Sequence, residues 1–238
     1  MARQRQIAFT LVELLVVVSI IALLVTMLMP SLQRGIELSR RAACKVNCRE
    51  IAKGVKLYAL EARFHRGGPK RAFPTVNPTP SGWASGNNAN RECLYRLVTT
   101  KFLSPGSLVC PSVNKARYDH FASGEASAYA FISMVGRPRT LNTCNAGMVI
   151  VGDRNPRFEP DSKNVISGES HQNSMAHLYP GRSREGQNIG RIDESAAWIE
   201  QPKVNTGTYK DDYIYESSNP GSDGQGTTTF NADVFLLN

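Results

Sequence analysis

The stretch IAFTLVELLVVVSIIALLVTMLM, residues 7–29, decides the fold class of this chain. From Phe9 to Met29 every side chain is apolar or a hydroxyl except that of Glu13. A helix of this length spans roughly 31 Å at ~1.5 Å per residue, about the thickness of the hydrocarbon core of a bilayer. Pro30 follows directly, so we expect a kink or break in the helix there. Residues 9–29 therefore predict a transmembrane helix that contains a single acid.

The flanks of this helix predict its orientation. Residues 1–8, MARQRQIA, hold Arg3 and Arg5 and no acid, which favours a cytoplasmic N-terminus and an extracytoplasmic remainder. A cleaved secretory signal is disfavoured, because its apolar run usually covers about 7–15 residues and MLMPSLQ is a poor cleavage site. A plain signal anchor fits the length and charge but leaves Glu13 unexplained, because a charge in lipid is costly.

Residues 7–24, IAFTLVELLVVVSIIALL, resemble the N-terminus of type IV pilins and of the pseudopilins of type II secretion. That family has a short basic leader, a cut before Phe, then Thr-Leu-Val-Glu-Leu and an apolar helix. The resemblance implies that a prepilin peptidase cuts between Ala8 and Phe9, so that residues 1–8 are the leader and the new Phe9 amine is methylated. Ala8 departs from the glycine that the family usually has before the cut.

The isolated acid gives this resemblance a physical reason. Alone in a bilayer, the Glu13 carboxylate is costly or takes up a proton. In a bundle of like subunits it can meet the Phe9 ammonium of a neighbour, where the two charges cancel at low dielectric. We therefore expect Glu13 to set the register of a filament in the inner (cytoplasmic) membrane. The resemblance also implies an assembly ATPase and an assembly platform in the membrane as partners.

Basic charge is concentrated directly after the anchor. The net charge is +8, and residues 34–71 hold eleven Lys or Arg against three Glu. We interpret this charge as a solvated helix face beside a membrane surface, and we expect no nucleic-acid partner.

Residues 30–66 predict an amphipathic extension of the same helix, ended by Gly67-Gly68-Pro69. Apolar residues recur there at helical spacing and form one stripe, which we expect to pack on the rest of the protein. A free cysteine behaves as a small hydrophobe, so the two cysteines of the stripe are interpreted as packing residues. The stripe consists of Cys44, Cys48, Ile51, Val55, Tyr58 and Ala62.

Residues 67–238 predict one extracytoplasmic head domain. A loop rich in Pro, Gly, Asn and Ser over 68–92 leads to a short helix over 92–103 and a brief extended segment over 108–113. One long helix followed by mainly antiparallel strands predicts the α+β class, with a pilin-like arrangement. The strand candidates are 128–136, 146–153, 186–193, 195–201, 211–217 and 233–238, with a hairpin near Asp193-Glu194.

A second resemblance concerns the head. RRAACKVNCREIAKGVKLYA (40–59), LVCPS (108–112) and WIEQP (198–202) are similar to a prepilin-like group of planctomycete-type bacteria. That group is named for a His, a nine-residue spacer and Asp-Gly. Here the candidate His is His177 and the candidate Asp is Asp193, but the spacer is longer and Glu194 replaces the glycine. The resemblance implies an architecture rather than an activity.

Catalytic motifs are weak in this sequence. It has no HExxH and no GxSxG, so we predict no enzyme and no catalytic residue. An alternative is a signal-anchored extracytoplasmic enzyme or binding protein with a site near His171, His177 and Asp193, to which Asp153 could add a carboxylate. We favour local hydrogen bonding for these residues.

Two further features stay open at this stage. Cys93, Cys110 and Cys144 are disulfide candidates in an extracytoplasmic head, but their spacing does not choose a pair. Pseudopilins often bind Ca²⁺ in a C-terminal loop, and SSNPGSDGQGTTTFNAD (217–233) is rich in oxygen ligands without EF-hand spacing. The weak calcium candidates are Asp211, Asp212, Asp223 and Asp233.

Overall fold

The computed structural model describes residues 10–61, 72–74, 89–112, 129–132, 140–142, 144–154, 173–174, 176–177, 184–204, 212–214 and 236–237. The chain divides into two compact units, Met1–Ser39 and Arg40–Asn238. We call Arg40–Asn238 the head unit and describe each unit by itself.

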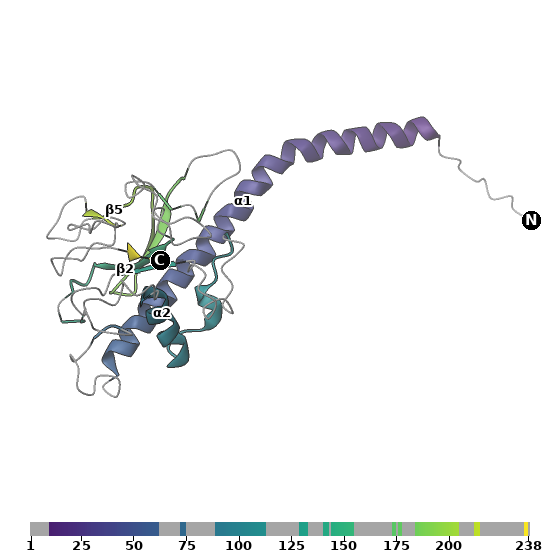
Figure 1. Cartoon of the computed structure of the whole chain (residues 1–238). Coiled ribbons are helices and arrows are strands. Elements are labelled where there is room, and N and C mark those ends of the chain that lie inside the picture. Colours follow the sequence, from purple (N-terminus) through teal and green to yellow (C-terminus); the bar gives the residue numbers. More distant parts are fainter. Residues whose placement is uncertain are drawn as a thin grey trace, which may run out of the picture. The chain divides into compact units, whose positions relative to one another are not determined.

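Helix α1 covers Leu11–Leu60 (Figure 1). It continues through Pro30, so a break does not occur there, and the alternative of a kink stays a prediction. The helix ends earlier than the predicted glycine pair: Glu61 N donates to Tyr58 O at 3.2 Å, an i→i+3 bond that tightens the last turn. Residues 62–71, which include Gly67-Gly68-Pro69, lie outside the described part of the chain.

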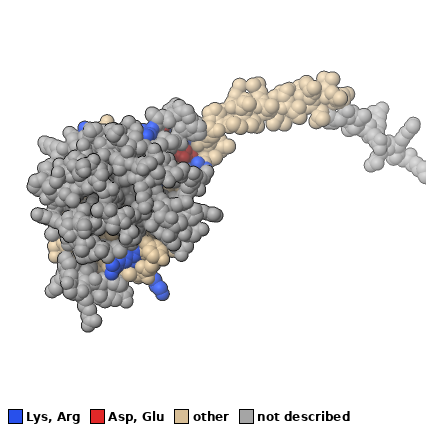
Figure 2. All heavy atoms as spheres, in the orientation of Figure 1, with Lys and Arg blue, Asp and Glu red and all other residues tan. Residues whose placement is uncertain are grey.

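The N-terminal part of α1 is apolar and exposed. From Leu11 to Leu32 its large hydrophobic side chains are between 48% and 79% exposed. On the face shown in Figure 2 this part of the helix is an uncharged surface. Within the described residues, α1 is the one helix long and apolar enough to cross a membrane. Length and composition therefore agree with the predicted anchor.

The stripe on the second half of α1 is buried in the head unit, as predicted. Cys44, Cys48, Ile51 and Val55 are fully buried, and Tyr58 is 3% exposed. Burial removes this face from water and is the main source of packing energy for the helix.

A five-stranded antiparallel sheet is the larger of the two described sheets of the head unit, with the strand order β4-β3-β2-β1-β7. The α+β prediction is confirmed. Each predicted strand range contains a strand, and β5 lies outside the predicted ranges. The strands are β1 Tyr129–Ile132, β2 Val149–Asp153, β3 Gln187–Arg191, β4 Ala196–Ile199, β5 Lys203–Val204, β6 Asp212–Tyr213 and β7 Leu236–Leu237. Strands β5 and β6 form a separate pair.

In the described residues between α1 and the sheet there are two short helices. The predicted helix over 92–103 is α2, Ala89–Thr99. The predicted extended segment over 108–113 begins one residue late, because a 3₁₀ turn, η2, covers Pro105–Leu108. Pro105 favours this turn, since its fixed φ suits the first position of a helix. Val109 is the first extended residue after it.

Strand β3 lies directly against α1. A Cβ added to Gly190 would lie 2.6 Å from Cys48 O on α1 and 2.7 Å from Val151 Cγ1 on β2. Only a residue without a side chain allows two backbones to approach so closely. The glycine at position 190 of β3 therefore fixes where the sheet meets the buried stripe of α1.

Candidate functional site

The first candidate site is the start of α1. Thr10 N and Thr10 Oγ1 donate to Glu13 Oε2 at 2.9 and 2.8 Å, and Glu13 N donates to Thr10 Oγ1 at 3.3 Å. This reciprocal arrangement is a capping box, which satisfies backbone donors at a helix N-terminus. Glu13 therefore has a local structural role in addition to the predicted one. The signal was readable, because Thr-x-x-Glu before an apolar run is the sequence pattern of this cap.

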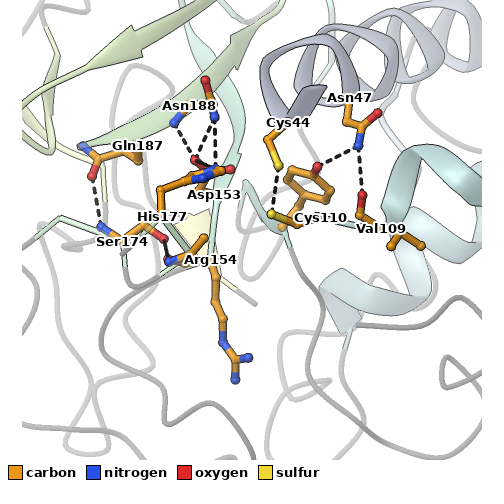
Figure 3. Close-up of polar contacts among 12 residues, drawn as sticks. Cys44, Asn47, Val109, Cys110, Asp153, Arg154, Ser174, His177, Gln187 and Asn188 are labelled. Atoms are coloured by element: carbon orange, nitrogen blue, oxygen red, sulfur yellow. Dashed lines mark hydrogen bonds and ion pairs between the residues drawn. The ribbon is translucent and has the colours of Figure 1, made fainter. Parts of the chain in front are cut away.

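The second candidate site is a group of side chains buried in the head unit. Cys44 on α1, Cys110 after η2 and His177 each offer one ligand atom, and these atoms lie within 4.8 Å of one another. We call these three residues the thiol cluster. Cys44 Sγ lies 2.8 Å from Cys110 Sγ, and Figure 3 shows the two sulfurs facing each other. All three side chains are buried.

Asn47 holds the segment that carries Cys110 against α1. Its Nδ2 donates to Val109 O at 3.0 Å and to the Tyr129 hydroxyl at 2.9 Å (Figure 3). Asn47 lies one helical turn after Cys44, so the same face of α1 supplies the amide and the thiol. This amide therefore links α1, the residues after η2 and β1 around the thiol cluster.

His177 is held from the sheet side by Asp153 at the end of β2. His177 Nε2 lies 3.3 Å from Asp153 Oδ2, and both side chains are fully buried. Asp153 Oδ2 also accepts from Asn188 N at 2.6 Å and Asn188 Nδ2 at 3.1 Å. The Asn188 amide lies 3.3 Å from His177 Nε2 as well. Asp153 therefore orients the imidazole, and Asn188 holds the Asp153 carboxyl group in place.

The segment before His177 is tied to the sheet by Ser174. Ser174 Oγ donates to Arg154 O at 2.6 Å, and Ser174 N donates to Gln187 Oε1 at 3.1 Å. These bonds join the chain near His177 to the end of β2 and the start of β3. The Trp198 ring lies edge-on to the imidazole, with the ring centroids 5.7 Å apart.

The buried polar groups alter one another's protonation. The hydrogen bond to Cys110 and burial both raise the pKa of Cys44. Hydrogen bonds from Cys44 and His177 lower the pKa of Cys110, against the effect of burial. Burial lowers the pKa of His177, but hydrogen bonds with Asp153 and Cys110 outweigh it and raise the pKa to about 10. These shifts favour a negative Cys110 sulfur and a protonated His177, with Cys44 as the thiol donor between the two sulfurs.

Two kinds of closed structural site suit these residues. Two sulfurs and one imidazole are the ligand types of a structural zinc site. Two sulfurs in contact are also the precursors of a disulfide.

Of the four residues considered for an alternative site, the structure brings His177 and Asp153 together. Asp193 lies instead in the exposed turn between β3 and β4, where Asp193 Oδ1 accepts from Ser195 N at 2.9 Å. Slight burial raises the pKa of Asp193, but the hydrogen bonds from Ser195 outweigh it and lower the value. Glu194 takes a left-handed φ of 69° in this turn. Asp193 thus acts as a turn residue, and His171 lies outside the described residues.

The remaining predicted site residues are the disulfide candidates and the calcium candidates. Cys93 is buried in α2 and Cys144 is half-buried. A pair among Cys93, Cys110 and Cys144 stays a prediction. The Cys110 sulfur instead contacts Cys44, which was outside that set. Asp212 lies in β6. Calcium binding also stays a prediction, and the other residues outside the described part are Ala8, Phe9, Asp211, Asp223 and Asp233.

Comparison with known families bears on the N-terminal site. Residues 3–29 match the family described as the prokaryotic N-terminal methylation motif. The N-terminus is type IV pilin-like. The match covers most of the predicted leader, the whole predicted anchor and Glu13. No curated protein and no solved structure matches the chain.

A pilin-like N-terminus implies, in general, processing by a prepilin peptidase and assembly with like subunits. Together with the exposed apolar helix it fits a membrane-anchored protein. The wider resemblance to the planctomycete-type group stays a prediction.

Proposed function

We propose that this protein is a structural subunit of a type II secretion pseudopilus or a type IV pilus-related filament. The observation that supports it is the methylation motif at residues 3–29, which coincides with an apolar, solvent-exposed helix carrying one acid. A peptidase cuts between Ala8 and Phe9, and the freed helix packs with copies of itself. The head then forms the outer surface of the filament and carries no catalytic role in this proposal.

The proposed topology follows from the charge of the leader. Arg3 and Arg5 keep the N-terminus in the cytoplasm, and the head unit lies beyond the inner membrane. An assembly ATPase and a platform protein in that membrane are the further partners of the proposed machine.

The capping box is compatible with the proposed pairing of Glu13. A carboxylate has two oxygens and about four acceptor positions. Both bonds from Thr10 go to the Oε2 atom. Capping therefore leaves the carboxylate with capacity for the Phe9 ammonium of a neighbouring subunit, a charge-assisted bond at low dielectric.

The cap and the charge can be separated by substitution. Glu13→Gln keeps a side chain that suits the third position of a capping box but removes the negative charge. Thr10→Ala does the reverse, since it removes the capping hydroxyl and leaves the carboxylate. If the charge sets the register, the Glu13→Gln protein is inserted and processed but does not assemble, whereas the Thr10→Ala protein assembles.

The experiment measures three quantities for each full-length variant in the producing cell. Membrane fractionation reports insertion, mass spectrometry of the N-terminus reports a start at methylated Phe9, and filaments sheared from cells report assembly. Normal filaments from Glu13→Gln would show that charge pairing is not needed. A mature chain that still starts at Met1 or Ala2 would contradict the proposed processing.

A further inference from the structure

The sulfurs of Cys44 and Cys110 are unusually close for residues 66 positions apart in the sequence. Their separation is 2.8 Å, with both side chains buried. Two sulfurs bound to one tetrahedral zinc at ~2.3 Å each would lie roughly 3.8 Å apart. A disulfide bond is about 2.0 Å long. The observed distance between the sulfurs is thus shorter than two ligands of one zinc ion would have, and it favours a direct bond between the sulfurs.

A contact other than that between the sulfurs holds the two cysteine-bearing segments together. Cys44 belongs to the buried stripe of α1, and the bond from Asn47 Nδ2 to Val109 O sets the residue before Cys110 against the same helix. The backbone segments that carry the two thiols are therefore already joined one helical turn away. Closing a bond between the sulfurs needs little rearrangement of either segment.

The electrostatics of the reduced pair act against oxidation. Hydrogen bonds from Cys44 and His177 lower the pKa of Cys110, and a stabilised thiolate makes a disulfide easier to reduce. The inference therefore depends on the geometry of the two sulfurs, and a bond between them leaves the contact between His177 and Asp153 in place.

We propose that Cys44 and Cys110 form a structural disulfide that joins α1 to the segment after η2. The inference relies on the proposed function only for the extracytoplasmic location of the head, where disulfides persist. It adds a covalent link between the helix that assembles and the head that the helix carries.

The bond forms by thiol–disulfide exchange with a disulfide oxidoreductase of the extracytoplasmic compartment. One cysteine, as its thiolate, attacks the disulfide of that protein, and one oxidant sulfur leaves as a thiolate. The other cysteine then attacks the mixed disulfide and releases the second oxidant sulfur. Cys44 and Cys110 lose two protons and two electrons, and the oxidant becomes a dithiol. Because both sulfurs are buried in the folded head, exchange takes place before the head closes.

Peptide mapping tests the bond directly on the full chain. The protein is extracted from membranes of the producing cell into detergent, and free thiols are alkylated with iodoacetamide under denaturing conditions without reductant. Trypsin then places every cysteine on a different peptide, and Cys44 separates from Cys48 because Lys45 lies between them. The five peptides are AACK (42–45), VNCR (46–49), ECLYR (92–96), FLSPGSLVCPSVNK (102–115) and TLNTCNAGMVIVGDR (140–154).

The expected result is AACK linked to FLSPGSLVCPSVNK, with VNCR alkylated. Cys48→Ser is the matched control, because Cys48 is equally buried on the same helix face one turn away, and it leaves the link intact. In Cys110→Ser, AACK becomes alkylated.

Alkylation of both AACK and FLSPGSLVCPSVNK in the unaltered protein overturns the disulfide. Zinc measured in that same sample at one ion per chain would identify a metal site in its place. Protease treatment of spheroplasts separates the two proposals. If both thiols are alkylated and the head is digested, only the disulfide is rejected. If both thiols are alkylated and the head is protected from the protease, the proposed topology is rejected as well.

Discussion

Substituting Gly190 by alanine tests the contact on which the packing of the head depends. The new Cβ would lie 2.6 Å from Cys48 O and 2.7 Å from Val151 Cγ1, whereas ordinary van der Waals contact of a Cβ atom lies at 3.4–4 Å. Val151 can adjust its side chain, but the carbonyl belongs to the backbone of α1, so strand and helix have to separate. Overpacking of this kind costs about 3 kcal/mol.

Part of this cost is offset in the unfolded state. Replacing glycine by alanine restricts the unfolded chain and stabilises the fold by about 0.7 kcal/mol. The net loss is about 2 kcal/mol, which lowers Tm by roughly 4–8 °C for a domain of this size. The control is Gly147→Ala, which has the same entropic effect but meets no atom within 4 Å and has no left-handed φ.

Differential scanning calorimetry of the full chain in detergent measures both variants against the unaltered protein. We expect Gly190→Ala to melt lower, and Gly147→Ala to melt at the same temperature or slightly higher. Equal melting of the two variants would refute the reasoning, because it would mean that β3 does not press on the backbone of α1.

Three further predictions concern the two candidate sites. Cys44→Ser and Cys110→Ser each remove the disulfide, which links residues 66 positions apart, and we expect each variant to lose about 4 kcal/mol of unfolding free energy. The double variant loses nothing further through the disulfide. Reduction of the unaltered protein lowers Tm by about as much as either single substitution. In the reduced protein, hydrogen bonds with Asp153 and Cys110 raise the folded-state pKa of His177 to about 10, above the ordinary 6.5, so folding binds a proton at His177 between these values. The lowered pKa of Cys110, about 6, makes folding release a proton from Cys110 between about pH 6 and 9. The two contributions have opposite signs, each at most ~1.4 kcal/mol per pH unit. We therefore expect Tm of the reduced protein to change little between about pH 6.5 and 9 and to fall from pH 9 to 10, where the contribution of His177 is lost without compensation; a Tm that falls steeply from pH 6.5 would contradict the lowered pKa of Cys110. Glu13→Gln abolishes filaments without affecting insertion, as cell fractionation and electron microscopy of sheared material would show.

Much of the fold followed from local patterns in the sequence. The apolar length of 9–29 predicts a spanning helix, and the helical spacing of Cys44, Cys48 and Ile51 predicts a buried face that the structure confirms. The strand ranges could also be located, since apolar runs between turn residues are short-range signals. The capping role of Glu13 belongs to this local information as well, because Thr10 lies only three residues away.

Local patterns therefore predict the anchor, its single acid, the buried helix face and the α+β class. The three-dimensional contacts were needed to show that Cys110 meets Cys44, that Asp153 rather than Asp193 holds His177, and that Gly190 passes over Cys48. These contacts join residues that lie far apart along the chain. Periodicity and hydropathy act between residues a few positions apart, whereas the partners of a thiol or a carboxylate depend on how a helix and a sheet meet.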